Sequence, residues 1–230
     1  MAAPALGSGL MVASNPSASL VIGSFVAAFA GLFPIVNPFG AVPLFLSLTA
    51  HLSEAERHRQ ARKVIRNAFV IMLVSLLLGG VLLEFFGISI SALRIAGGLI
   101  VAYLGFHMIF PLHANAATGH AKPSEAADYT LIPLAFPSLT GAGSIAVIMG
   151  FSTKIATLPT LAEKSAGYAI VAVAIGSVAW LSLLILRAST RVARWLNPHG
   201  MDALTRFMGL LLVGIGVQLI ADGIRSFSQG

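Results

Sequence analysis

Two apolar stretches of this chain are each interrupted by two prolines four residues apart and then by glycine. The first, residues 33–43, reads FPIVNPFGAVP, and the second, residues 132–144, reads IPLAFPSLTGAGS. Proline lacks an N–H and clashes with the preceding turn, so neither stretch can continue as one regular helix. In a bilayer the freed backbone groups need protein, water or a ligand as partners. Two such breaks in the two halves of a chain indicate a transporter's substrate site, and we place the functional site there.

The composition is that of an integral membrane protein. Of the 230 residues, 57% are hydrophobic and 10% are charged, whereas a soluble domain has about 25% charged residues. The mean hydropathy is +0.91. The net charge is +6, but the basic residues fall in short loops between apolar runs, where they set membrane topology. We therefore expect no nucleic-acid partner. The chain has no cysteine, which excludes disulfides and thiolate metal sites.

Six segments reach the length of about 20 apolar residues that a membrane span requires. They cover residues 20–50, 67–86, 95–112, 131–151, 166–186 and 203–221. The predicted fold is an all-α membrane protein with six transmembrane helices, of which the first and the fourth are broken. We expect one transmembrane domain, residues 20–230. Residues 1–19 are interpreted as a short leader, because they lack the Lys or Arg that begins a cleaved signal peptide.

Loop charge predicts the orientation in the membrane. The loop at residues 54–66 holds five basic residues and two acidic ones, and residues 187–194 hold three arginines. The positive-inside bias places both loops in the cytoplasm and both termini outside. The outer loop with Lys154 and Lys164 is a mild exception.

The two halves of the chain resemble each other. Pro34 and Pro38 match Pro133 and Pro137 at an offset of 99 residues. At an offset of 111, the matching residues are Leu93, Gly98, Leu99, Gly105 and Ile109 with Leu204, Gly209, Leu210, Gly216 and Ile220. We expect one repeat over residues 20–112 and another over residues 131–224. Three spans are an odd number, so the repeats would sit in opposite orientations, as in many secondary transporters.

Asn37-Pro38-Phe39-Gly40, with Pro43 following, resembles the first-span signature of the MarC family of bacterial and archaeal membrane proteins. That family's second signature ends in Gly-Pro-Gly, and Ala142 stands here at the proline position. The resemblance covers nearly the whole chain. It implies a multi-pass protein of the plasma (inner) membrane, and some members transport glycine, alanine, serine and threonine. It also implies that the functional positions are Asn37, Pro38, Gly40, Thr140, Gly141 and Gly143.

A small neutral amino acid needs donors for its carboxylate and acceptors for its ammonium group. N–H groups at the start of a second half-helix favour the anion, and carbonyls freed at the end of the first accept from the ammonium. Glycine lets the ligand approach the backbone, and Asn37 offers both donors and an acceptor. Thr140 and Ser144 add hydroxyls. The competing interpretation is a pair of structural kinks whose glycines pack helix against helix.

Two titratable residues in the spans are candidates for ion coupling. Glu84 lies near the outer end of the second span and His107 near the inner end of the third. Each has a structural alternative, because Glu84 can reach the membrane interface and a lone histidine is more often a hydrogen-bonded interface residue. The spans hold no acidic pair to cage sodium. We therefore favour a proton as the coupling ion, with Glu84 and His107 as carriers.

The leading hypothesis is a secondary transporter of small neutral amino acids, and the alternative is a non-transporting scaffold or regulatory protein. An intramembrane enzyme would need converging His, Asp or Glu, and neither these nor metal-ligand spacing is found. We expect no enzyme activity, cofactor or metal. A channel filter and an ATP-binding loop are also absent from the sequence. The basic residues 57–66 are expected to touch membrane lipid. The oligomeric state, the exact substrate and the direction of transport stay open.

Overall fold

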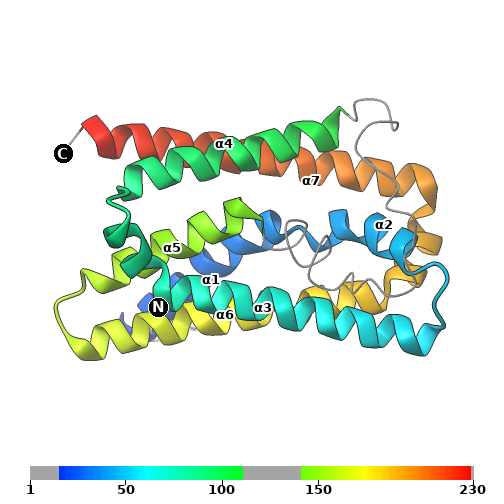
Figure 1. The fold of residues 1–230 in the computed structure, drawn as a ribbon, viewed down its shortest axis with the longest axis horizontal. Helices are drawn as coiled ribbons and strands as arrows, with labels where there is room; N and C mark the ends of the chain where they lie inside the picture. Colours follow the sequence, from blue (N-terminus) through cyan, green and yellow to red (C-terminus); the bar gives the residue numbers. More distant parts are fainter. Residues whose placement is uncertain (1–15, 111–140, 229–230) are drawn as a thin grey trace, which may run out of the picture.

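The computed structural model describes residues 16–110 and 141–228, and nearly all of them are helical (Figure 1). The helices in these ranges are α1 (Pro16–Val36), α2 (Pro38–Leu48), α3 (Glu54–Phe85), α4 (Ile90–Ile109), α5 (Ala142–Ala156), α6 (Leu161–Arg187) and α7 (Ser189–Ser228). The prediction of an all-α fold is confirmed.

Five helical segments of the described ranges are long and apolar enough to cross a membrane. They are Leu20–Leu48, Glu54–Phe85, Ile90–Ile109, Leu161–Arg187 and His199–Ser228. The predicted fourth span is described only from Gly141 onward. Its helix, α5, has 15 residues and is about 22 Å long, less than the roughly 30 Å of a bilayer's hydrocarbon core. The residues before it lie outside the described ranges, so the sixth span stays a prediction.

Helices α3 and α6 both begin with a capping box. In α3 the Ser53 hydroxyl accepts from the Glu56 N–H at 3.4 Å, and the Glu56 carboxylate accepts from the Ser53 N–H at 3.0 Å. Thr160 and Glu163 make the same two bonds in α6, at 3.2 and 3.3 Å. Because of its cap, α3 begins at Glu54. The basic residues that we expected in a loop at 54–66 therefore lie on the first turns of a helix.

The helices lie in three rows in Figure 1, with α4 and α7 on one side, α5, α1 and α2 in the middle, and α3 and α6 on the opposite side. The pair α4 and α7 pack along each other. The buried side chains of α1, α2, α3, α5 and α6 make the main hydrophobic cluster. That cluster includes no residue of α4, and from α7 only residues near its start such as Met201. The pair α4 and α7 meets the other helices chiefly where α4 packs on α5 and α7 packs on α2.

Glycines bring the backbones of α4 and α7 into contact. A Cβ atom added at Gly98 would lie 2.6 Å from the carbonyl oxygen of Gly216, and one added at Gly216 would lie 2.6 Å from that of Gly98. Gly105 and Gly209 face each other in the same way, at 2.6 and 2.7 Å. Small residues permit such close approach between membrane helices. No side chain larger than hydrogen fits at these four positions without displacing backbone.

Candidate functional site

The first predicted break falls at Asn37, between the end of α1 and the start of α2. Asn37 has φ 47° and ψ 61°, a left-handed conformation that Asn tolerates better than most residues. Pro38 explains the change of direction, because proline disfavours the right-handed helical region for the residue before it. Pro38 also has no N–H to offer the Pro34 carbonyl. The chain therefore turns at Asn37 and leaves a carbonyl of α1 without its helical donor.

The Asn37 side chain holds the turn together. It is buried, with 7% of its surface exposed. Its Oδ1 accepts from the Gly40 N–H at 3.1 Å, and its Nδ2 donates to the sulfur of Met108 on α4 at 3.2 Å. A thioether is a weak acceptor. The side-chain N–H of Asn37 therefore has a weak acceptor, and a carboxylate in its place would accept a stronger hydrogen bond.

Gly40 has a different role from the one its sequence suggests. We expected a glycine that lets a ligand approach the backbone. A Cβ added at Gly40 would instead clash with the Asn37 amide nitrogen and lie 3.0 Å from the Met108 methyl. In this structure the space beside Gly40 is thus filled by the side chain that caps it and by Met108.

Helix α5 begins in the second predicted break. Its N-cap, Gly141, makes no side-chain capping bond, as a residue without a side chain must. Ser144 is fully buried, and its hydroxyl donates to the Gly141 carbonyl at 2.8 Å. The Ser144 N–H donates to the Gly141 carbonyl at 3.0 Å, whereas the N–H groups of Ala142 and Gly143 have no side-chain cap within the described residues. Uncapped N–H groups at the start of a helix are a common arrangement for binding an anion. Thr140 lies outside the described residues.

The two helix ends lie near each other, and α4 runs past both. α5 begins beside the junction of α1 and α2 (Figure 1). A Cβ added at Gly143 would lie 3.4 Å from Ile35 of α1 and would clash with Val101 of α4. Val101 and Met108 are two turns apart on α4, so one face of that helix touches both ends. We call this neighbourhood, formed by Asn37, Pro38, Gly40, Gly141, Gly143 and Ser144, the break region.

Sequence reasoning did not identify Val101 and Met108. Both are apolar residues in an apolar helix, and nothing in the sequence marks which neighbour they touch. The only available signal was indirect, since both flank Gly105, one of the residues of the internal repeat.

The two candidate proton carriers are not brought together. Glu84 is exposed in the last turn of α3, and His107 is half-buried in the last turn of α4. These turns lie at opposite ends of the bundle (Figure 1). The His107 ring packs against Tyr103 with centroids 4.4 Å apart, and it directly precedes Met108. His107 is therefore the candidate nearer to the break region.

Among the described residues, no group of three or more His, Cys, Asp or Glu side chains could hold a metal ion. The arrangement around Asn37 offers backbone donors, backbone carbonyls and one amide, all uncharged. Such groups can bind a polar molecule by hydrogen bonds.

The fold defines a multi-pass α-helical membrane protein. Residues 22–228 match the family described as MarC family integral membrane protein. The chain belongs to this family. It is 38% identical to the "UPF0056 inner membrane protein MarC" of Escherichia coli O1:K1 over 202 residues, which cover 84% of this chain and 90% of that protein. Identity to proteins of the same name from Escherichia coli K12 and Shigella flexneri is 37% with the same coverage. No solved structure matches the chain.

Proposed function

We propose that this protein is a secondary transporter of small neutral amino acids in the inner membrane, and that it binds them in the break region. The observation that carries the proposal is the buried Asn37 between α1 and α2, with the start of α5 beside it. Burying a polar side chain within a membrane span is costly, and the side-chain N–H of Asn37 has only the weak acceptor of the Met108 thioether as its partner. The names of the relatives, inner membrane proteins, support the location.

The residues of the break region are uncharged, and their hydrogen-bonding groups suit a zwitterion. The uncapped N–H groups of α5 and the Asn37 amide are donors for a carboxylate. The Pro34 carbonyl, which Pro38 deprives of a donor, is an acceptor for an ammonium group. Val101 and Ile35 lie close to Gly143 and leave little space beside it, which favours the short side chains of glycine, alanine, serine and threonine over larger ones.

We also propose that two inverted repeats build the transporter. The offset of 111 residues takes Gly98 to Gly209 and Gly105 to Gly216, and the contacts run from Gly98 to Gly216 and from Gly105 to Gly209. Each contact is thus converted into the other, as at an interface between two units related by a twofold axis. The capping boxes of α3 and α6 add a further matched pair. This symmetry supports six spans with both termini on the same side of the membrane and a fourth span completed by residues before Gly141, and the loop charge favours the outside for the termini.

Proton coupling is the favoured energy source within this proposal. His107 precedes Met108, whose sulfur contacts Asn37, and for this reason His107 is the first candidate carrier. Glu84 lacks such a link. Uptake that follows a sodium gradient and ignores a pH gradient would exclude this part of the proposal.

The proposal is tested by uptake of labelled glycine, alanine, serine and threonine into vesicles that contain the purified protein. We expect uptake of at least one of the four, driven by a pH gradient and competed by the unlabelled compound. Protein-free vesicles are the control. Neither uptake nor efflux of any of the four, from protein that is monodisperse in detergent, would favour the alternative of a non-transporting scaffold or regulatory protein.

A further inference from the structure

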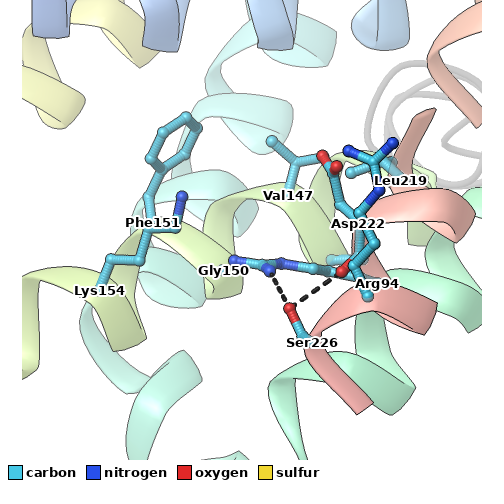
Figure 2. Close-up of a pocket in the computed structure, with 10 residues that line it drawn as sticks. Arg94, Val147, Gly150, Phe151, Lys154, Leu219, Asp222 and Ser226 are labelled. Carbon is cyan, nitrogen blue, oxygen red and sulfur yellow. Dashed lines mark hydrogen bonds between the residues drawn. The ribbon is translucent and has the colours of Figure 1, made fainter. Parts of the chain in front are cut away.

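A polar cavity lies away from the break region, at the end of the bundle where α4 begins and α5 and α7 end. It is a cavity of about 390 Å³ (Figure 2). Cationic side chains from all three helices line it together with one carboxylate and an apolar wall. Its lining includes Arg94, Lys154, Arg225, Asp222, Val147 and Phe151. We call this chamber the basic cavity.

Hydrogen bonds hold two of its charged residues in place. The Arg94 guanidinium donates to the Ser226 hydroxyl at 3.1 Å, and that hydroxyl donates to the Asp222 carbonyl oxygen at 2.9 Å (Figure 2). The Asp222 carboxylate accepts from Gln218 at 3.1 Å. A guanidinium has five N–H donors and a carboxylate has about four acceptor positions. Both residues are therefore fixed while keeping the capacity to bind a ligand.

The charge pattern selects a ligand that carries both signs. Three cations would attract any anion, such as phosphate, but an anion alone would leave the Asp222 carboxylate without a partner in the ligand. A zwitterion satisfies both, with its carboxylate toward Arg94 and its ammonium toward Asp222. Val147 and Phe151 form an apolar wall for a short side chain. We propose that the basic cavity is a second binding site for the transported amino acid, a vestibule before the break region. This inference rests on the proposed function.

One face of α5 leads from the vestibule to the break region. Gly143, Ala146, Gly150 and Lys154 follow one another at intervals of three or four residues and so share a face. Ala146, Gly150 and Lys154 line the cavity, and Gly143 lies about 16 Å farther along the helix than Lys154.

Helix α4 closes this face between the two sites. Its Gly97 lies so close to Ala146 that an added Cβ would clash, and its Val101 covers Gly143. A substrate in the vestibule is therefore separated from the break region by the contact between α4 and α5.

The absence of cysteine allows a direct test of occupancy. The single-cysteine variant Val147→Cys would report on whether the basic cavity is occupied. Trp195→Cys is the control, because the Trp195 side chain, near the start of α7, is 84% exposed. We expect saturating L-alanine to slow maleimide labelling at position 147 about tenfold and to leave position 195 unchanged. Inorganic phosphate should protect neither. Adding Arg94→Gln should raise the alanine concentration for half-protection about tenfold, the effect of losing one charged hydrogen bond. Arg191→Gln, at the other end of the bundle, should not change it.

The other outcomes separate this inference from the proposed function. Unchanged labelling at position 147, in a protein that transports alanine into vesicles, would overturn the proposal that the basic cavity binds the amino acid and would leave the proposed transport function intact. Protection by phosphate or by phosphatidylethanolamine micelles but not by alanine would assign the cavity to another ligand and also overturn it. Should Arg94→Gln aggregate, Arg94→Lys keeps the charge and is expected to raise the half-protection concentration by a smaller factor. A half-protection concentration of alanine that changes in neither Arg94 variant would contradict the role of Arg94.

Discussion

The chain contains the motif Asn-Pro-x-Gly twice, at residues 37–40 and at residues 197–200. Both asparagines have a positive φ, 47° and 57°, and both stand at a junction between helical segments. The differences begin with ψ, which is 61° at Asn37 and 167° at Asn197. Asn37 is buried and caps Gly40, whereas Asn197 is exposed ahead of the span His199–Ser228.

Depth in the membrane gives the two motifs different meanings. At the end of a span, water satisfies the backbone groups that proline frees, and the motif only changes the direction of the chain. Within a span, the same groups must be satisfied by protein or ligand. The identical four-residue pattern is therefore a turn in one place and a candidate binding site in the other.

The largest expected effect separates the two asparagines directly. Asn37→Ala removes an amide that we assign to the substrate and should lower amino-acid uptake roughly 10- to 100-fold, the range for a hydrogen bond to a charged group. Asn197→Ala is the matched control and should leave uptake within about twofold. Initial rates in vesicles with equal protein content measure both. Equal losses in the two variants would remove the distinction.

Substituting alanine for the two motif glycines, Gly40 and Gly200, should affect the stability of the protein differently. Gly40→Ala places a Cβ against the Asn37 amide and Met108, and such overpacking lowers the free energy of unfolding by about 1–3 kcal/mol. A Cβ at Gly200 meets only Leu196, at 3.4 Å, so Gly200→Ala should be neutral or stabilising by up to about 1 kcal/mol. Thermal unfolding in detergent measures the difference. A stable Gly40→Ala variant would show that the packing beside Asn37 is loose.

The smallest expected effect concerns the partner of Asn37. Met108→Leu keeps the volume but removes the sulfur that accepts from the Asn37 amide, and it should cost less than about 1.5 kcal/mol of stability. Because the sulfur competes with a ligand for this N–H, the affinity for alanine should stay equal or rise slightly. Binding to purified protein is the measurement. A clear loss of affinity would make Met108 a ligand-binding residue.

The fold class and the location of the first turn could be predicted, because hydropathy and proline act locally. Ser53 and Glu56 also indicate the start of α3. The predicted segment begins later, at residue 67, because the charged first turns of α3 lower the average hydropathy. The contacts of Val101 and Met108 could not be predicted, since apolar helix faces look alike in sequence. The different depths of the two asparagines could be predicted, because Asn37 lies inside the apolar segment 20–50 and Asn197 lies between the arginines of residues 187–194 and the apolar segment 203–221. The predicted role of Thr140 in substrate binding stays a prediction, because Thr140 lies outside the described residues.

The backbone contact between α4 and α7 has a consequence for motion. Side chains in an ordinary interface can change rotamer while helices slide, but Gly98 and Gly105 offer no rotamers to change. Sliding α4 along α7 would drive a neighbouring Cβ into a carbonyl oxygen. The two helices should therefore move as one rigid body against α2 and α5, on which they rest. Any opening of a path to the break region would then be a tilt of this body, with its hinge in the connections to α3 and at the junction of α7 near Asn197.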